Sequence, residues 1–289
     1  MTADTVLLIT TSYDFAAEYV IKALEERSVP YFKFDTDRFP SQIRIGFKPP
    51  VDLVFDNGTR SLYGCQVKSV WYRRNVDPEL PEGLDTGVSE FCIRETKAFL
   101  SGVLSTLETT RWLSSPQAIT IAESKPYQLH KAVKLGFLVP DTVITNNEIL
   151  VRELANRYKL VAKAVSSGYV ESDNGNKAIF TSAITDSDIG DLAGLELAPV
   201  TFQERLDKAS DIRVTVVGDI VFAAKILSQA RESSRIDWRA TDDPNIEHLR
   251  HSLPPKIEDL CRKLVQQFSL AFGAIDLVKT KKGNTYFWN

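Results

Sequence analysis

The alternation of two hydrophobic patterns over residues 5–39 restricts the fold more than any other feature of the chain. Residues 5–12 (TVLLITTS) form a short apolar run that is typical of a buried strand. Apolar residues then recur at helical spacing after Asp14, a residue type that often caps a helix N-terminus. Residues 29–39 (VPYFKFDTDRF) return to strand alternation. This strand–helix–strand order predicts a parallel α/β unit.

Strand and helix patterns continue through the middle of the chain. Residues 51–73 alternate again around an Asp-Asn-Gly turn, which predicts a hairpin. We expect one long helix over residues 89–112, a short strand over 117–122 and a second helix over 125–135. The Ser-Ser-Pro sequence at residues 114–116 is typical of a boundary between two structural regions.

The last part of the chain is rich in strand patterns. We expect strand, helix and strand between residues 142 and 172, and a further strand over 200–206. Residues 211–229 predict two strands joined by a tight Val-Gly-Asp-Ile turn. A helix over 254–271 and a hairpin of 274–278 with 285–288 follow. At 289 residues the chain is too long for one small core and suits two or three coupled subdomains.

The composition argues against several functional classes. With a net charge of −3 and a pI near 5.8, the chain has no basic surplus that would indicate a nucleic-acid partner. We find no signal-peptide pattern and no apolar segment of membrane-spanning length, so we expect no membrane association. The three cysteines are scattered and lack C-x-x-C spacing, which favours reduced thiols in the cytoplasm over disulfides or a zinc site.

Two lysines occupy positions where an anion would stabilise them. Lys163 lies within the apolar run KLVAKAV, where an unpaired buried ammonium group would cost several kcal/mol. Its partner is either a neighbouring carboxylate or an anionic ligand, and the sequence favours neither. Lys125 begins a predicted helix, where backbone N–H groups favour anions, although a lysine at such a position is commonly only solvated.

A small polar loop, Ser166-Ser167-Gly168-Tyr169, follows Lys163. Such a loop is suited to cover a phosphate group, but taken alone it is more simply interpreted as an ordinary hairpin turn. The chain contains neither a Walker A pattern nor a G-x-G-x-x-G pattern after its first strand. The common glycine-rich phosphate-binding loops are therefore excluded.

Charged residues also lie within the predicted strands of the last third. Asp211 and Arg213, like Asp237 and Arg239, are two residues apart, so each pair would share one face of an extended segment. Arginine suits bidentate recognition of a carboxylate or phosphate, and a local ion pair is the alternative. Asp276 lies in an apolar strand, either as a Mg²⁺ ligand or as the hydrogen-bond partner of a helix cap or an arginine.

Taken in their order along the chain, these motifs resemble those of the ATP-grasp superfamily. The matching features are the two lysines, the small loop, FQE (202–204), DIR (211–213), VVGD (216–219) and GAIDL (273–277). Further motifs resemble the microviridin-type (graspetide) peptide cyclases: FDTDRFP (34–40), VWYRR (70–74), WLSSP (112–116), KLGFLVPDTVITN (134–146) and DWR (237–239). The resemblance covers nearly the whole chain.

The resemblance implies an α/β (α+β) ATP-grasp fold in which the nucleotide lies between two β-sheets. It divides the chain into an N-terminal domain (1–115), a central or lid subdomain (116–198) and a C-terminal subdomain (199–289). The implied activity is an ATP- and Mg²⁺-dependent ligase that activates Asp or Glu side chains of a ribosomal precursor peptide, leader plus core, as acyl-phosphates. A hydroxyl or amine then closes an ω-ester or ω-amide ring. A homodimer is also implied.

The resemblance further implies a role for each candidate residue. Phosphate binding is assigned to Lys125, Lys163, Ser167 and Gly168, and the γ-phosphate to Arg213 and Arg239. Asp237 or Asp211 would accept or orient a proton. Adenosine would be bound by Gln203, Glu204, Leu206 and Asp207. The metal ligands would be Asp276 and Asn289.

One departure from the family pattern concerns the metal site. The closing strand of the family reads like W-E-I-N, whereas Trp288 is followed directly by Asn289 in this chain. We expect an active enzyme whose sequence is incompletely represented rather than a natural loss of Mg²⁺ binding. Two alternatives stay open: a ligase that adds an amino acid to a protein or peptide terminus, and a nucleotide-binding regulator without turnover.

Overall fold

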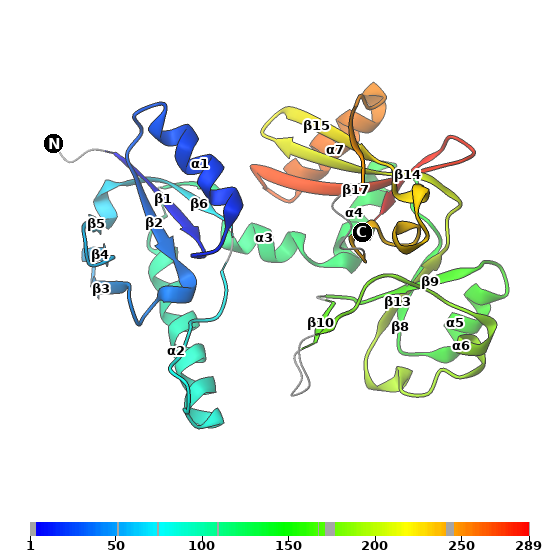
Figure 1. Cartoon of the computed structure of the whole chain (residues 1–289), viewed down its shortest axis with the longest axis horizontal. Coiled ribbons are helices and arrows are strands. Elements are labelled where there is room, and N and C mark those ends of the chain that lie inside the picture. Colours follow the sequence, from blue (N-terminus) through cyan, green and yellow to red (C-terminus); the bar gives the residue numbers. More distant parts are fainter. Residues whose placement is uncertain are drawn as a thin grey trace. The chain divides into compact units, whose positions relative to one another are not determined.

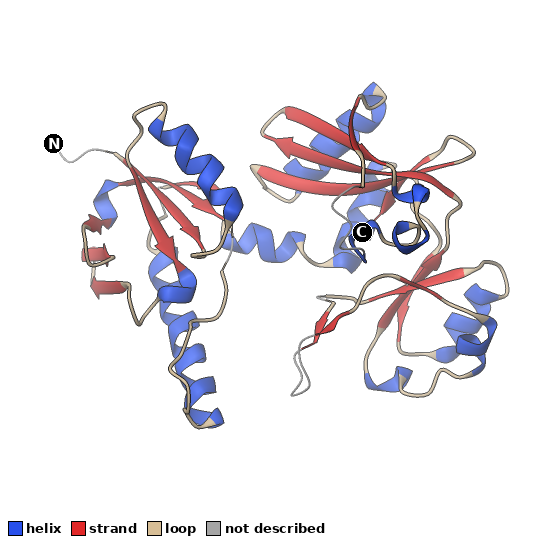
Figure 2. Ribbon diagram, viewed as in Figure 1, coloured by secondary structure: helices blue, strands red, loops and turns tan. Residues whose placement is uncertain are grey.

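A computed structural model of the chain describes residues 4–50, 52–73, 75–108, 110–166, 168–170, 177–240 and 246–288. The chain folds into two units, residues 1–116 and 117–289. Helices and strands are mixed along the sequence in both units (Figures 1 and 2), so the predicted α/β class is confirmed. The division of the chain into three subdomains stays a prediction.

A four-stranded parallel sheet is the centre of the first unit. The predicted strand–helix–strand opening forms β1 (Thr5–Thr10), α1 (Phe15–Glu25) and β2 (Tyr31–Asp35), and β1 pairs with β2 in parallel. β6 (Val67–Tyr72) and β7 (Arg111–Leu113) extend this sheet in the order β2-β1-β6-β7. The predicted parallel α/β unit is therefore confirmed.

Helices cover both faces of this sheet (Figure 1). α1 begins at a side-chain cap, because Asp14 accepts a hydrogen bond from the backbone N–H of Ala16. α2 (Thr86–Ser105) packs Leu100 and Val103 against the core on the opposite face. The same core is closed by an antiparallel sheet of β3 (Arg44–Lys48), β4 (Asp52–Asp56) and β5 (Ser61–Tyr63), with the predicted Asp-Asn-Gly turn between β4 and β5.

Two element predictions close to residue 116, where the first unit ends, are wrong. The long helix predicted over residues 89–112 ends at Ser105, because residues 111–113 pair with β6 as the edge strand β7. The short strand predicted over 117–122 is the helix α3 (Pro116–Ala122). Pro116 occupies the first helical position, where its missing N–H group leaves no hydrogen bond unmade.

The second unit contains two antiparallel sheets. The first has the order β12-β9-β13-β8 and packs against α5 (Glu148–Ala155), whose Val151 and Leu154 are buried in its core. Its strands are β8 (Thr142–Thr145), β9 (Leu160–Lys163), β12 (Ser182–Ala183) and β13 (Val200–Glu204). A short ladder of β10 (Tyr169–Val170) and β11 (Lys177–Ala178), and the helix α6 (Asp186–Gly190), belong to the same region.

The second sheet of this unit has the order β16-β15-β14-β17-β18. Its strands are β14 (Lys208–Val217), β15 (Ile220–Ile226), β16 (His248–His251), β17 (Phe272–Thr280) and β18 (Thr285–Trp288). The helices α4 (Lys125–Leu135) and α7 (Pro255–Gln267) pack on one face of it (Figure 1), sharing a core with Ile212, Val214 and Leu277. Gly218 adopts a φ of 57° in the predicted tight turn between β14 and β15.

Short 3₁₀ helices fill several connections: η1 (Thr36–Arg38), η2 (Gly64–Gln66), η3 (Leu195–Leu197), η4 (Ser228–Ala230), η5 (Glu232–Ser234) and η6 (Trp238–Ala240). Within the described parts of the chain, no helix is both long enough and apolar enough to cross a lipid bilayer.

Strand pairing sets the position of several polar side chains in the second unit. Arg213 lies opposite Asp276, and Asp276 lies opposite Trp288.

We expect Leu277→Ala to lower the free energy of unfolding by about 2–5 kcal/mol, because Leu277 is fully buried on β17 and its removal leaves a cavity. Urea denaturation would measure this loss. Ile220→Ala is the matched control, since Ile220 is 61% exposed and its truncation should change the unfolding free energy by at most about 0.5 kcal/mol. Equal effects of the two substitutions would contradict the packing of β17 described above.

Candidate active site

Lys163, at the end of β9, is the most deeply buried lysine among the predicted site residues. Its Nζ donates a hydrogen bond to Oε1 of Gln203 at 2.7 Å and lies 3.5 Å from the centroid of the Trp288 ring. Gln203 is itself fixed by a 2.8 Å hydrogen bond from its Nε2 to Oγ1 of Thr142. Burial, and then the positive charge of Lys208, hold the pKa of Lys163 well below its ordinary value.

Lys208 is a second buried lysine beside Trp288, and the sequence analysis did not identify it. Its Nζ lies 2.9 Å from Oδ1 of Asp211, 2.9 Å from the carbonyl oxygen of Ile236 and 4.6 Å from the Trp288 ring centroid. Asp211 also accepts a 2.5 Å hydrogen bond from Oγ of Ser228. Both carboxylate oxygens of Asp211 are therefore engaged, which suits an orienting role better than proton abstraction.

The carboxylate of Asp276 joins the two predicted arginines. Its Oδ1 lies 2.8 Å from a terminal nitrogen of Arg213 on the neighbouring strand, and its Oδ2 lies 3.3 Å from a terminal nitrogen of Arg239. The antiparallel register places Arg213 and Asp276 opposite each other, so this ion pair follows from the pairing of β14 with β17. Of the two interpretations left open for Asp276, the arginine contact is present in this structure.

Asp237 and Arg239 form the second predicted Asp-x-Arg pair. Oδ1 of Asp237 accepts hydrogen bonds from Nε and from the backbone N–H of Arg239, both at 3.1 Å. Its Oδ2 accepts bonds from the backbone N–H and the hydroxyl of Thr181, at 3.3 and 3.0 Å. Burial raises the pKa of Asp237, but the hydrogen bonds and charge of Arg239 outweigh burial and lower the pKa overall.

The side chain of Lys125, the first residue of α4, contacts the segment that follows β9. Its Nζ donates to the carbonyl oxygens of Ala164 and Ser166 at 2.8 and 2.5 Å. Burial and the nearby charge of Arg239 lower the pKa of Lys125. Lys125, Lys163 and Arg239 therefore lie within electrostatic reach of one another, as the predicted phosphate site requires.

These side chains form one charged cluster, which we define as Lys125, Lys163, Lys208, Asp211, Arg213, Asp237, Arg239 and Asp276. Cations outnumber carboxylates within it, and several members are buried. Positive groups held together in a poorly solvated region favour an anionic ligand, because each like charge disfavours the charged form of its neighbours. Lysine and arginine side chains both commonly bind phosphate groups.

Other predicted site residues lie at the edge of the charged cluster or outside it. Leu206 packs against Trp288 in a small apolar core, and the backbone N–H of Glu204 donates to Asp141. Asp207 is exposed and pairs with Lys281 at 2.8 Å. The backbone carbonyl of Gly168 accepts a hydrogen bond from Ile179. Ser167 and Asn289 lie outside the described residues.

A weak pattern in the sequence marks some of the site residues that the sequence analysis missed. Lys208 precedes the DIR motif by three residues, and a bulge between Lys208 and Ser210 turns its side chain toward Asp211. Trp288 is distinguished in the sequence only by its place before Asn289. Thr142, Thr181 and Ser228 carry no distinguishing pattern, because their contacts arise from strands and loops that are distant in sequence.

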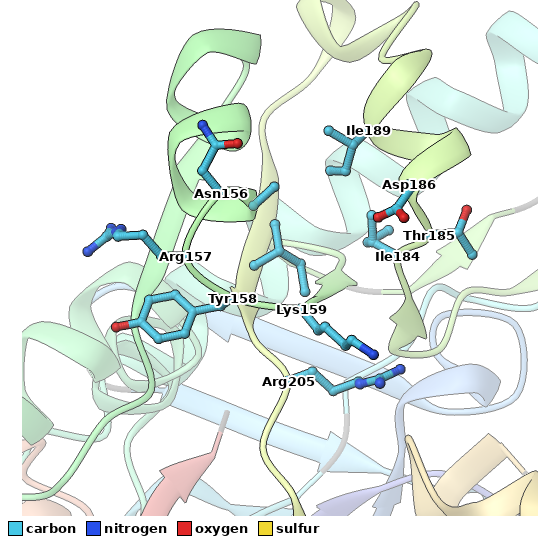
Figure 3. Close-up of a pocket in the computed structure, with 11 residues that line it drawn as sticks. Asn156, Arg157, Tyr158, Lys159, Ile184, Thr185, Asp186, Ile189 and Arg205 are labelled. Carbon is cyan, nitrogen blue, oxygen red and sulfur yellow. The ribbon is translucent and has the colours of Figure 1, made fainter.

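A separate pocket of about 410 Å³ lies in the same unit. Figure 3 shows it between the end of α5, the start of β9 and the start of α6, with Lys159 and Arg205 extending in the same direction. The charged cluster contributes no lining residue to this pocket, so the two sites are distinct. For the portions of the chain that are described, no group of three or more His, Cys, Asp or Glu residues is arranged to hold a metal ion.

Comparisons with known proteins agree with this architecture. A family model described as the MvdD pre-ATP grasp domain matches residues 5–120. The macrocyclase MdnC from Microcystis aeruginosa MRC, solved with precursor peptide MdnA, is similar at 31% identity and a TM-score of 0.88, over 98% of this chain and 89% of that one. A search of curated protein sequences found no match.

Two further solved structures are similar. A Chryseobacterium gregarium RiPP-associated ATP-grasp ligase, in complex with ADP and a leader and core peptide, aligns at 26% identity and a TM-score of 0.91, over 99% of this chain and 88% of that one. D-alanyl-alanine synthetase A from Vibrio cholerae aligns at 13% identity and a TM-score of 0.61, over 99% and 88%. The second likeness concerns the fold alone.

We expect Lys208→Met to destabilise the protein by about 3–5 kcal/mol, because it leaves the buried carboxylate of Asp211 without its ion-pair partner. Urea denaturation would measure the change in unfolding free energy. Lys281→Met is the matched control, since Lys281 and Asp207 form an exposed pair that should contribute less than about 1 kcal/mol. A Lys208→Met variant as stable as Lys281→Met would contradict the buried pair.

Proposed function

We infer the function of this chain from the microviridin-type (graspetide) family of ATP-grasp ligases, to which it belongs. It is an ATP-dependent macrocyclase that joins side chains within a ribosomal precursor peptide made of a leader and a core. Identity of 31% to the macrocyclase MdnC over 98% of this chain supports the assignment. The ligase from Chryseobacterium gregarium, solved with ADP and with leader and core peptides, supports both the nucleotide and the peptide partner.

The observation that carries the proposal is the charged cluster itself. Lys163 is buried beside other cations, and burial lowers the pKa of its amine because it disfavours the charged form. The triphosphate of ATP would bring negative charge to a cluster in which cations outnumber carboxylates, and would favour the protonated amine. We assign Lys125 and Lys163 to the α- and β-phosphates, and we propose that Gly168 and Ser167, the latter outside the described residues, also bind phosphate. Arg213 and Arg239 would bind the γ-phosphate.

The adenosine would lie beside the connection from β13 to β14. Gln203 is fully buried there, and Leu206 packs against Trp288. We propose that Gln203 and Glu204 line the adenine pocket, that the Leu206 backbone contacts the base edge and that Asp207 contacts the ribose. Because Oε1 of Gln203 already accepts from Lys163, the adenine and phosphate parts of this site are connected by one hydrogen bond.

The residues present fit a magnesium ion that is held mainly by phosphate oxygens. Mg²⁺ needs only one or two carboxylates when a nucleotide supplies further oxygen ligands, and Asp276 is such a carboxylate at the centre of the cluster. Asn289, the second proposed ligand, lies outside the described residues. When bound, the ion would neutralise phosphate charge. Because Arg213 and Arg239 contact opposite oxygens of Asp276, metal binding there would replace one of these contacts.

The proposed reaction has two steps. A carboxylate oxygen of an Asp or Glu in the core peptide attacks the γ-phosphorus, and the bond from that phosphorus to the oxygen that bridges it to the β-phosphorus breaks. ADP is the leaving group, and the peptide then carries an acyl-phosphate. A Ser or Thr hydroxyl, or a Lys amine, then attacks the acyl carbon, loses its proton and displaces phosphate. Each ring removes one water from the peptide overall. Asp211 and Asp237 would orient Lys208 and Arg239, since their oxygens already accept hydrogen bonds from neighbours.

We also propose a cytoplasmic location. The described cysteines are all unpaired thiols, as is usual in a reducing compartment. Burial raises the pKa of the Cys261 thiol to about 12, so this cysteine stays protonated and is a packing residue rather than a nucleophile.

We expect Lys163→Ala and Asp276→Ala each to lower the rate of precursor dehydration by about 100-fold or more, because each removes a group that stabilises phosphoryl charge. The measurement is mass spectrometry of a precursor peptide encoded beside this gene, incubated with ATP and Mg²⁺. Lys281→Met, on an exposed turn, is the control and should dehydrate the peptide normally.

The same experiment separates the alternative functions. An amino-acid ligase would increase the peptide mass, and a regulator without turnover would leave the mass unchanged. Unchanged dehydration in both Lys163→Ala and Asp276→Ala would overturn the assignment of the charged cluster as the active site.

Nucleotide affinity should also depend on pH in a defined direction. Burial and the charges of Lys208, Arg239 and Lys125 hold the pKa of Lys163 well below the ordinary value of 10.5, opposed in part by Asp237. Since the protonated amine binds phosphate, ADP affinity should be full below this lowered pKa and should fall as pH rises through it. Gln203 and the Trp288 ring, which both contact the amine, do not titrate in this range.

Isothermal titration calorimetry across a pH series would measure this decline. Lys163→Arg keeps its charge at every pH in the series, so its ADP affinity should hold to higher pH than that of the wild type. An identical decline in both proteins would show that a group other than Lys163 controls the pH dependence.

A further inference from the structure

Trp288 lies at the end of an edge strand, and this position does not by itself explain the burial and the contacts of its side chain. The side chain is buried, and two ammonium groups lie over its ring, Lys163 at 3.5 Å and Lys208 at 4.6 Å from the centroid. Cation–π attraction is strongest for tryptophan and increases when the pair is removed from water. Both conditions are met, because Lys163 and Lys208 are buried as well.

The ring itself is held in place by its surroundings. Trp288 pairs with Asp276 in the register of β17 and β18, and its side chain packs against Val161, Leu206 and Val278. Val161 and Lys163 belong to β9 of the first sheet, whereas Val278 belongs to β17 of the second. The indole therefore has a fixed position between groups from both sheets of this unit.

The chemistry of an aromatic partner differs from that of a carboxylate in one respect that matters at an anion site. A carboxylate neutralises an ammonium group that it contacts and repels an incoming phosphate. The face of an indole carries partial negative charge but no formal charge. It can stabilise a buried ammonium group while leaving the positive charge available to a ligand. Lys208 already has Asp211 as its carboxylate partner, so it can remain close to Lys163.

We propose that Trp288 is a positioning residue for nucleotide binding, which holds the ammonium groups of Lys163 and Lys208 over its ring so that Lys163 meets the phosphates. This inference rests on the proposed function, because it takes Lys163 to be a phosphate ligand. It adds a residue that neither the predicted ligand set nor the Asp-x-Arg pairs include. Trp288 acts through Lys163 and need not touch the nucleotide.

The first test compares two apolar replacements by isothermal titration calorimetry with ADP and Mg²⁺. Trp288→Phe keeps an aromatic face and should bind ADP within about threefold of the wild type, whereas Trp288→Leu removes the face and should bind about 10- to 30-fold more weakly. Far-ultraviolet circular dichroism and urea denaturation would show whether each variant is folded. Wild-type affinity in Trp288→Leu, or equal losses in both variants, would overturn the proposal.

A fluorescence experiment provides a readout that does not depend on the stability of Trp288→Leu. The variant Trp71→Phe/Trp112→Phe/Trp238→Phe leaves Trp288 as the single tryptophan of the chain. Adding ADP and Mg²⁺ should change its emission, because phosphate bound to the ammonium group over the ring changes the electric field that the ring experiences. In the same background, Lys163→Met should remove most of that change.

Different results would contradict the proposed function and the role of Trp288. A wild-type protein that does not bind ADP would overturn the proposed function and this inference together. A wild-type protein that binds ADP, with Trp288 emission unchanged at saturating ADP, would leave the proposed function intact and overturn only the role of Trp288.

Discussion

The buried ammonium group of Lys163 is the constraint on which the rest of the site depends. Removing a charge from water is unfavourable unless the surroundings compensate for it. Its described contacts include an amide oxygen from Gln203 and the face of Trp288, and the nearby carboxylate of Asp237 partly offsets the effect of burial on its pKa. Cations outnumber carboxylates in the charged cluster around it, which favours an anionic ligand there.

The carboxylates of the charged cluster have a complementary effect. Asp211, Asp237 and Asp276 each contact at least one neighbouring cation, so the lysines and arginines can lie close together without mutual repulsion disrupting the fold. Asp276 is the central member, because its two oxygens contact arginines from a strand and from a 3₁₀ helix. In the proposed function, this carboxylate would also be the ligand for Mg²⁺.

The sequence was sufficient for the features that depend on local pattern. The parallel opening unit, the tight turn after β14 and the closing hairpin follow from strand alternation and turn chemistry. Lys163 and Asp276 were identified because a charge within an apolar strand is unusual. Lys208 and the role of Trp288 were missed, since their meeting depends on which strands become neighbours. The strand predicted over residues 117–122 is a helix for a local reason. Pro116 favours the first position of a helix, and this preference outweighed the strand preference of the β-branched residues that follow.

Lys163 and Trp288 come from different sheets of the second unit, and the packing of Val161 of β9 against Trp288 and Val278 joins the same two sheets. The apolar core between the sheets and the charged cluster therefore share one side chain. A change of packing around the indole ring would be transmitted directly to the Lys163 amine.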